Sequence, residues 1–145
     1  LDTAQKLYEK KLTTYPRSDC EYLPQSQFSD AKIILQNLYN INEKQLANWA
    51  KKCDLKTKSR AWNDKKITAH HAIIPTKVKV NLMSLTIEER NIYFLIAQAY
   101  IAQFYPVHIY DQTKISIEYM QELFVTSGRV VKQMGWKEWE YSIIF

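Results

Sequence analysis

The strongest helix signal in the chain is the stretch TIEERNIYFLIAQAYIAQF, residues 86–104. Thr86 and Glu89 occupy the two positions of a capping box, in which a hydroxyl and a carboxylate satisfy N–H groups at a helix start. Pro106 is expected to stop the helix, because proline has no N–H to donate. Five residues recur at the spacing of one helix face and are predicted to be core: Ile92, Leu95, Ile96, Ala99 and Tyr100.

A shorter helix is expected at the start of the chain. Asp2 is predicted to cap it, with Gln5 three residues later in the capping-box position. Gln5, Glu9 and Leu12 then fall near one stripe of this helix, at spacings of four and three. The β-branched residues 13–14 are expected to end it.

Two further helices are predicted between residues 29 and 53. Ser29 is expected to cap a helix that runs to about Asn40, and Asn42 to cap one that runs to about Cys53. Hydrophobic staples are expected at both starts, between Phe28 and Ile33 and between Ile41 and Leu46. A basic, turn-prone link follows at residues 54–66.

The pattern changes after Pro106. Alternating residues predict a strand whose two faces differ in polarity. One face is Ile109, Thr113, Ile115, Ile117 and Tyr119, and the other is Lys114, Ser116 and Glu118. A second strand is predicted over residues 123–132, interrupted at Gly128. The predicted fold class is mainly α with a smaller β part (α+β), with a helical domain at residues 1–106 followed by a β-rich part at residues 107–145.

Composition excludes several classes of protein. Of the 145 residues, 46% are hydrophobic and 24% are charged, which excludes a disordered or collagenous chain. No apolar run reaches the roughly 18 residues that span a bilayer, so no membrane partner is expected. The net charge of +5 weakly favours a polyanionic partner. The sequence begins at Leu1 rather than Met, so we expect a piece of a longer polypeptide.

The segment Thr14-Tyr15-Pro16-Arg17-Ser18 carries the clearest chemistry. Proline disfavours helix for the residue before it, so Tyr15 is expected to be extended. Residues two apart in an extended run point to one side, which would bring the Tyr15 phenol and the Arg17 guanidinium together. A guanidinium favours a phenolate and grips phosphate oxygens, so this pair suits attack on a phosphodiester to form a covalent phosphotyrosine. A packing role for Tyr15 stays open, because the chain has 10 tyrosines.

This region resembles the nucleophile motif of type IA DNA topoisomerases, in its topoisomerase III form. The matching residues are Leu7-Tyr8-Glu9, Leu12 through Cys20, and Tyr22-Leu23-Pro24. The resemblance implies that Tyr15 is the catalytic tyrosine and that Arg17 stabilises the transition state. It also implies DNA-binding roles for Gln5, Glu9 and Ser18.

The second informative run reads WNDKKITAHHAIIPT and spans residues 62–76. Adjacent histidines in a β-prone segment face opposite ways, so one of His70 and His71 could meet a phosphate while the other packs or faces solvent. A pair of buried or surface histidines is the more usual outcome. A zinc site that adds Cys20 and Cys53 fails on spacing. The two cysteines are expected to be a reduced pair, and a disulfide between them stays open as the alternative.

This run also resembles topoisomerase III. The resemblance implies that His70 contacts the phosphate at the scissile site, and His71 and Ile74 favour the III-type over the bacterial I-type. Tyr15 and His70 are 55 residues apart, and their motifs stand in the order found in the family. Because both motifs occur in this order, the resemblance to topoisomerase III is not expected to arise by chance.

The resemblance implies a reaction that needs more than this chain. A single strand would be cleaved to a 5′-phosphotyrosine, another strand passed through the gap, and the cut religated without ATP. The family's Mg²⁺ is held by an absent toprim domain, so no metal ligand and no activity are expected for the fragment alone. The only Glu-x-Glu, residues 138–140, is expected on a solvated strand face.

The expected partners are single-stranded DNA and the missing domains of the same polypeptide. The enzyme is expected to be a monomer in the bacterial cytoplasm, associated with the nucleoid or a plasmid. The β-rich part would belong to the arch domain of the enzyme.

Three other interpretations compete with this one. A tyrosine recombinase normally places its tyrosine late, after a His-x-x-Arg, whereas Tyr15 is early and Ile73 lies three residues after His70. A non-catalytic module that binds single-stranded DNA fits the basic charge and the Lys65-Lys66 pair. A generic helical scaffold would show no salt-sensitive affinity for single strands.

Overall fold

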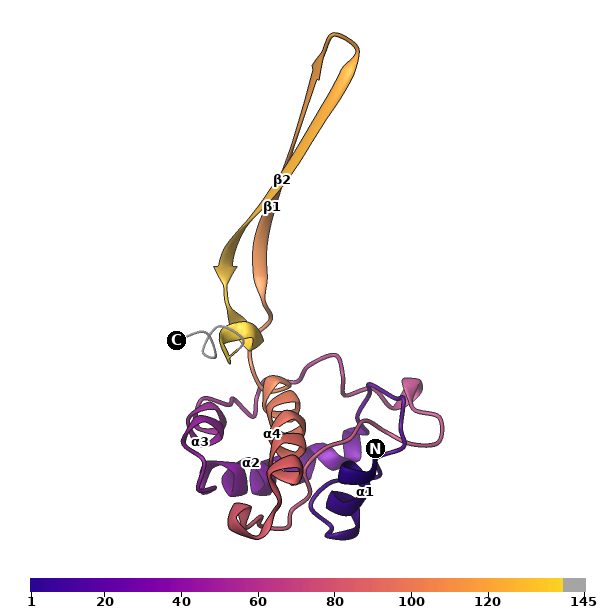
Figure 1. Cartoon of the computed structure of the whole chain (residues 1–145), viewed down its shortest axis with the longest axis vertical. Coiled ribbons are helices and arrows are strands. Elements are labelled where there is room, and N and C mark those ends of the chain that lie inside the picture. Colours follow the sequence, from indigo (N-terminus) through magenta and orange to yellow (C-terminus); the bar gives the residue numbers. More distant parts are fainter. Residues whose placement is uncertain (140–145) are drawn as a thin grey trace. The chain divides into compact units, whose positions relative to one another are not determined.

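The computed structural model describes residues 1–139. The chain divides into two compact units, Leu1–Tyr105 and Pro106–Phe145. The first unit is helical and the second contains a two-stranded β-hairpin (Figure 1). The predicted fold class, mainly α with a smaller β part, is confirmed. No helix in residues 1–139 is long and apolar enough to cross a membrane.

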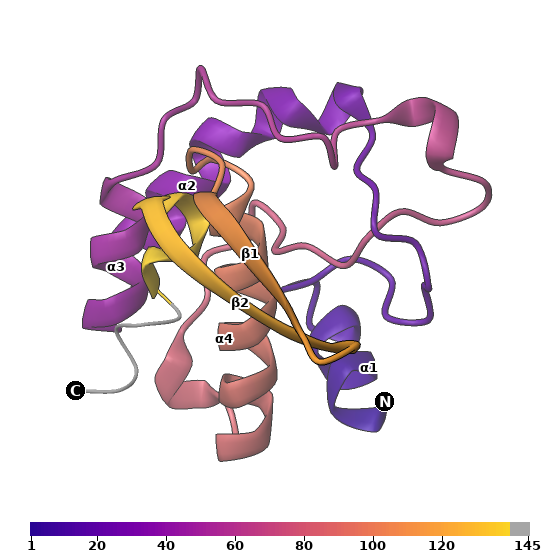
Figure 2. The same ribbon diagram turned by 90° about the horizontal axis from the view of Figure 1, so that it is seen from above.

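The α-helices of the first unit are connected by long irregular segments. They are α1 (Asp2–Glu9), α2 (Ala31–Tyr39), α3 (Lys44–Lys51) and α4 (Ile87–Ala102). Three short 3₁₀ helices lie between them: η1 (Gln25–Asp30), η2 (Asp64–Lys66) and η3 (Leu82–Ser84). Seen from above, α4 lies between α3 on one side and α1 on the other (Figure 2).

The interior of the first unit is built on α4. The buried residues recur at helical spacing: Tyr93, Ala97, Tyr100, Ile101 and, just past the helix, Phe104. The predicted core stripe is therefore wrong at Leu95, which is 59% exposed, and at Ala99, which is exposed as well. Tyr100 is buried, and Ile92 and Ile96 are half-buried. Apolar residues cover most of the circumference of α4, so their spacing fits more than one face.

An aromatic cluster joins α4 to the connecting segments. The rings of Phe28 and Trp62 pack edge to face with centroids 4.9 Å apart, and those of Tyr100 and Phe104 do so at 5.1 Å. Each such pair contributes about 0.5–1.5 kcal/mol beyond its burial. Phe28 is half-buried and packs against the core through these rings, and the predicted staple to Ile33 is wrong, since Ile33 is 49% exposed.

The starts of α2 and α3 differ from the predicted caps. The Ser29 hydroxyl donates to the carbonyl of Ser26 within η1, and α2 begins after Asp30 without a side-chain cap. For α3 the cap is Glu43 rather than Asn42, because the Glu43 carboxylate accepts from two N–H groups of the first turn, at 3.1 and 2.6 Å. The start of α2 thus follows directly on a 3₁₀ helix. The start of α3 is capped by a side chain longer than the short polar ones preferred at this position.

The first helix also differs from its prediction at both ends. Leu1, without a side-chain bond, is its N-cap, so Asp2 is the first helical residue and not the cap. The helix ends at Glu9, because the backbone of Lys11 turns into the left-handed region at φ 60°. Leu12 therefore leaves the helical stripe on which it was predicted to lie.

The turn after α1 is a Schellman motif. The N–H of Lys11 donates to the carbonyl of Tyr8 at 2.8 Å, and the N–H of Leu12 donates to that of Leu7 at 3.0 Å. These bonds satisfy carbonyl groups that a helix end leaves free. Leu7 and Leu12 are both buried, so the turn directs the following segment along the interior.

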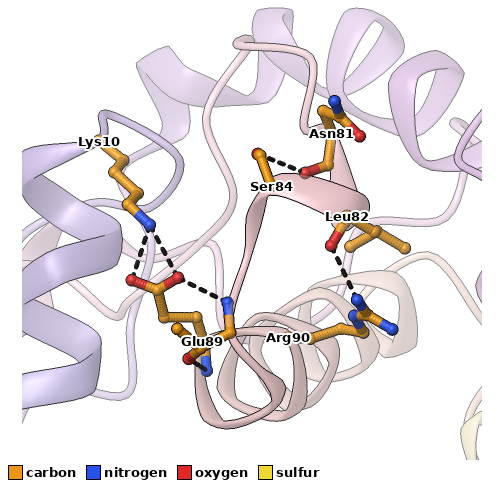
Figure 3. A network of polar contacts seen from close by, with 7 residues as sticks. Lys10, Asn81, Leu82, Ser84, Glu89 and Arg90 are labelled. Atoms are coloured by element: carbon orange, nitrogen blue, oxygen red, sulfur yellow. Dashed lines mark hydrogen bonds and ion pairs between the residues drawn. The ribbon is translucent and has the colours of Figure 1, made fainter.

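Glu89 joins the start of α4 to the end of α1 (Figure 3). The predicted capping box is confirmed: the Thr86 hydroxyl accepts from the N–H of Glu89, whose carboxylate accepts from the N–H of Thr86. The same carboxylate holds the ammonium of Lys10, with Nζ 2.7 Å from each oxygen. The Glu89 side chain is only 3% exposed. The hydrogen bond from Lys10 and, second, that from the Thr86 N–H hold the pKa of Glu89 below its usual range.

The second unit is built around an antiparallel hairpin of β1 (Ile109–Tyr119) and β2 (Glu122–Gln133). Its two turn residues, Met120 and Gln121, have φ of 49° and 64°, as a tight hairpin turn requires. Both predicted strands are confirmed. The predicted interruption at Gly128 is wrong, because Gly128 pairs with Thr113 within the continuous ladder.

A glycine closes the base of this hairpin. Gly135, at φ 54°, begins η4 (Gly135–Trp139), and a Cβ there would collide with the carbonyl oxygens of Pro106 and Val107. The next N–H, of Trp136, donates to the Pro106 oxygen at 2.9 Å. Glu138 lies in η4, so its predicted place on a strand face is wrong, and Glu140 lies outside the described residues.

The turn at Lys11 predicts a stabilising substitution. Lys11→Gly should raise the free energy of unfolding by about 0.5–1 kcal/mol, because glycine removes the left-handed strain but gains freedom in the unfolded chain. Urea unfolding followed by circular dichroism measures this change. Lys6→Gly within α1 is the matched control and should lower stability by about 1 kcal/mol. Destabilisation by both substitutions would contradict the Schellman geometry.

The buried carboxylate of Glu89 predicts a pH dependence of stability. Because folding lowers its pKa, its contribution is present above the unfolded pKa of about 4.3 and is lost as the pH falls through the folded value. Glu89→Gln should therefore lower the melting temperature near neutral pH, with the difference from the wild type shrinking in acid. Glu118→Gln, at an exposed position of β1, is the control and should have the melting temperature of the wild type at every pH. A constant difference at every pH would rule out this coupling.

Candidate active site

A short antiparallel backbone pairing joins the two sequence motifs. The N–H of Thr14 donates to the carbonyl of Ile74 at 2.9 Å, and the N–H of Thr76 donates to that of Leu12 at 3.0 Å. The Thr14 hydroxyl adds a third bond by accepting from the N–H of Ile74 at 2.9 Å. Segments that are distant in the sequence are thereby fixed side by side just before Tyr15.

The ring of Tyr15 contacts two other rings. Its centroid is 4.5 Å from that of His70, at an interplanar angle of 34°, and 5.6 Å from that of Tyr8, at 85°. Tyr15 is half-buried and His70 is exposed. The structure therefore brings together the phenol and the imidazole on which the two motifs depend.

Arg17 and Ser18 follow Tyr15 on a segment without regular secondary structure. Thr14 and Pro16 are bends, so the chain is not a strand there, and the shared orientation of Tyr15 and Arg17 stays a prediction. Arg17 is exposed. The Ser18 hydroxyl accepts from the N–H of Cys20 at 3.2 Å, which tightens the turn after the tyrosine.

One face of α1 approaches this site. Gln5 and Glu9 are joined by a hydrogen bond of 3.1 Å, and Tyr8, which contacts Tyr15, lies three residues after Gln5 on the same helix. Residues three and four apart share a helix face, so Gln5, Tyr8 and Glu9 do so. The contact made by Tyr8 was not predicted, although its spacing from Gln5 is a signal for it.

His71 is used in a different way from His70. Its Nδ1 lies 2.7 Å from the carbonyl oxygen of Ala72, and its Nε2 lies 3.0 Å from the amide nitrogen of Gln27. A carbonyl only accepts and an amide nitrogen only donates, so these partners fit a neutral ring protonated on Nδ1. His71 thus anchors the segment, whereas the exposed His70 lies against Tyr15.

Several other tyrosines are unsuited to act as a nucleophile. Burial raises the pKa of both Tyr93 and Tyr100, which disfavours their phenolates. Tyr105 is buried and donates its hydroxyl hydrogen to the carbonyl of Trp49. Tyr15 differs from these three tyrosines because it is only half-buried and its ring contacts that of a histidine.

The two cysteines are free thiols. Burial raises the pKa of Cys53 to about 12, so its thiol is unreactive near neutral pH. Cys20 lies near Tyr22, its sulfur 3.7 Å from that carbonyl oxygen. In residues 1–139 there is no group of three His, Cys, Asp or Glu side chains that could hold a metal ion.

The family model for DNA topoisomerase matches residues 1–143. The chain is 43% identical over 138 residues to DNA topoisomerase 3 of Vibrio cholerae, covering 94% of this chain and 21% of that protein. It is 43% identical over 139 residues to DNA topoisomerase 3 of Haemophilus influenzae, covering 95% of this chain and 21% of that protein. The enzyme of the same name from Bacillus subtilis is 38% identical over 138 residues, covering 94% and 19%.

These matches run through both units and include the segments that form the Tyr15 site. The chain spans only about a fifth of the length of the relatives it matches. It belongs to the DNA topoisomerase family, as a type IA segment similar to the topoisomerase III enzymes.

Proposed function

We propose that this chain supplies the nucleophile of a type IA DNA topoisomerase that cleaves single-stranded DNA. The observation that carries the proposal is the contact between the rings of Tyr15 and His70, from two motifs 55 residues apart. The backbone pairing of Thr14 with Ile74 supports it, because it fixes both rings at one place on the surface.

The reaction is a transesterification. The phenolic oxygen of Tyr15 attacks the phosphorus, the bond from phosphorus to the 3′ oxygen breaks, the phenol loses its proton and the departing oxygen gains one. The products are a 5′-phosphotyrosine and a free 3′-hydroxyl. The phosphotyrosine keeps the bond energy, so another strand passes through the gap and the reverse attack rejoins the DNA without ATP.

The neighbours of Tyr15 have distinct roles in this reaction. Arg17 is exposed and, within residues 1–139, no carboxylate forms an ion pair with it, so its guanidinium can bind the pentavalent phosphate. His70 holds a phosphate oxygen next to the phenol. Gln5, Glu9 and Ser18 supply amide, carboxylate and hydroxyl groups that contact the strand around the cut.

Mg²⁺ is implied by the family, but the residues of this chain do not fit it. This cation prefers several oxygen ligands in octahedral geometry, and residues 1–139 offer no cluster of three candidate ligands. The ion is therefore assigned to a toprim domain elsewhere in the polypeptide. On its own, the chain should bind a single strand but cleave it poorly.

The two units take different places in the proposed enzyme. Residues 1–106 form the active-site tyrosine domain, and residues 107–145 form part of the β-rich arch. Every residue of both hairpin strands is exposed, including Ile117 and Phe124, which pair across the strands. Such a hairpin is only marginally stable without further strands, so the rest of the arch should cover it. The whole enzyme would act as a monomer in the bacterial cytoplasm, on nucleoid or plasmid DNA.

Tyr15→Phe tests the proposed nucleophile. In the full-length enzyme that contains this segment, with Mg²⁺ and a 3′-labelled single-stranded oligonucleotide, the label should become attached to the wild-type protein and not to the variant. The adduct is trapped with detergent and measured on a denaturing gel. Tyr39→Phe, at an exposed position of α2, is the matched control and should form the adduct normally. A labelled adduct with Tyr15→Phe, or none with the wild type despite firm binding, would favour a non-catalytic DNA-binding module.

Arg17→Ala tests stabilisation of the transition state. Cleavage should slow about a hundredfold or more, while the affinity for the single strand falls much less, because the guanidinium is needed most at the pentavalent phosphate. Arg17→Lys should recover part of the rate, since it keeps the charge without the bidentate fork. Single-turnover cleavage and equilibrium binding separate the two effects. Equal losses of rate and affinity would assign Arg17 to binding alone.

A further inference from the structure

A run of exposed basic residues precedes the histidine motif of the candidate active site, and we call it the basic strip. We define it as Lys58, Arg60, Lys65 and Lys66, four exposed residues of the segment that leads into the histidine motif. In both ribbon views, η2, which contains the last two of them, lies at the same end of the first unit as the loop that follows α1 (Figures 1 and 2).

Backbone bonds hold the strip against the segment that continues from Tyr15. Leu23 runs parallel to Trp62: its N–H donates to the carbonyl of Ala61 at 2.7 Å, and its carbonyl accepts from the N–H of Asn63 at 3.0 Å. The strip is therefore part of the folded unit and not a free loop.

The strip is also connected to the tyrosine through Tyr22. The Lys66 ammonium lies 3.0 Å from the Tyr22 hydroxyl and 4.7 Å from its ring centroid. The carbonyl of Tyr22 accepts from the N–H of Ala72 at 2.8 Å, and Thr14, next to Tyr15, donates its hydroxyl hydrogen to the carbonyl of Ala72 at 3.4 Å. Three contacts thus lead from Lys66 to the residue before the nucleophile.

The positive charge of the strip is not neutralised within the unit. Lys58 contacts the neutral Gln25 amide oxygen at 2.8 Å and the ring of Phe28 at 5.0 Å. The one acidic residue between Lys58 and Lys66, Asp64, accepts from the N–H of Gln25. Within residues 1–139, none of the four basic side chains forms an ion pair. Exposed lysines without acidic partners suit the phosphates of a nucleic acid strand.

We propose that the basic strip binds the phosphates of the DNA piece that stays attached to Tyr15 after cleavage. This proposal rests on the proposed function, in which Tyr15 holds the 5′ phosphate of the cut. The attached piece then runs from Tyr15 toward its 3′ end, whereas the other piece ends in a hydroxyl that is not bonded to this chain. The strip would hold the attached piece in place while the gap is open.

The first test uses the 145-residue chain and fluorescence anisotropy with a short, labelled single-stranded oligonucleotide. Lys58→Ala/Lys65→Ala/Lys66→Ala should bind about tenfold or more weakly at low salt, and the slope of log K against log salt should fall by about 2. The matched control, Lys32→Ala/Lys44→Ala/Lys79→Ala, removes the same charge at other exposed positions and should bind nearly as the wild type does. Equal losses in both triple variants would overturn the proposal. Lys65→Ala alone, expected to lower the slope by about 0.7, decides the question if the triple variant does not fold.

The second test asks which side of the cut the strip binds. The full-length enzyme with Tyr15→Phe, which cannot cleave, is titrated with oligonucleotides that extend from the cleavage site only toward the 3′ end or only toward the 5′ end. The triple substitution in the strip should weaken binding of the first oligonucleotide and leave the second unchanged. A loss confined to the second, or shared equally, would contradict the assignment. Failure of the proposed chemistry would appear separately, as a missing covalent adduct in the Tyr15 experiment.

Discussion

The backbone hydrogen bonds between Thr14 and Ile74 and between Thr76 and Leu12 are the constraint on which the site depends. The segment after α1 runs along the interior, where an N–H or carbonyl group without a partner costs free energy. No helix or sheet of its own satisfies these groups, so a distant segment must do so. The consequence is that His70, four residues before Ile74, lies beside Tyr15.

A second constraint acts just before this segment, at the end of α1. Glu89 is nearly buried, and its carboxylate is satisfied by Thr86 within α4 and by Lys10 at the end of α1. Removing either partner would leave a charged group short of hydrogen bonds in a protected place. The start of the central helix therefore fixes the end of the helix that leads into the tyrosine segment.

The sequence predicted those features that depend on neighbouring residues or on a family motif. The capping box of Thr86 and Glu89 is local, so its two residues were sufficient to predict it. The strands were predicted because apolar and polar residues alternate along them, which makes one face of the hairpin more apolar than the other. The buried face of α4 was not predicted correctly, because apolar residues lie on most sides of this helix. Which face is buried depends on tertiary neighbours such as Phe28, and the spacing of residues within the helix does not reveal them.

The candidate site shows the same division. The motifs singled out Tyr15 and His70, whose rings are in contact, while the role of Arg17 stays a prediction. They did not predict the contact of Tyr8 with Tyr15, nor the carbonyl and amide that bind His71. These contacts depend on where α1 ends and on the tertiary pairing of the two segments. The end of α1 is itself set by a left-handed lysine, a backbone state that sequence preferences disfavour.

The contacts of the Tyr15 ring with those of Tyr8 and His70 limit its freedom to swing about its own side-chain torsions. In the proposed enzyme, a DNA end bonded to this phenol could not be carried far by rotation of the side chain alone. The opening that admits a second strand would then have to come from displacement of the whole helical unit relative to the rest of the polypeptide. The tyrosine would act as a rigid anchor point, and the mechanical flexibility of the enzyme would lie in the connections between its domains.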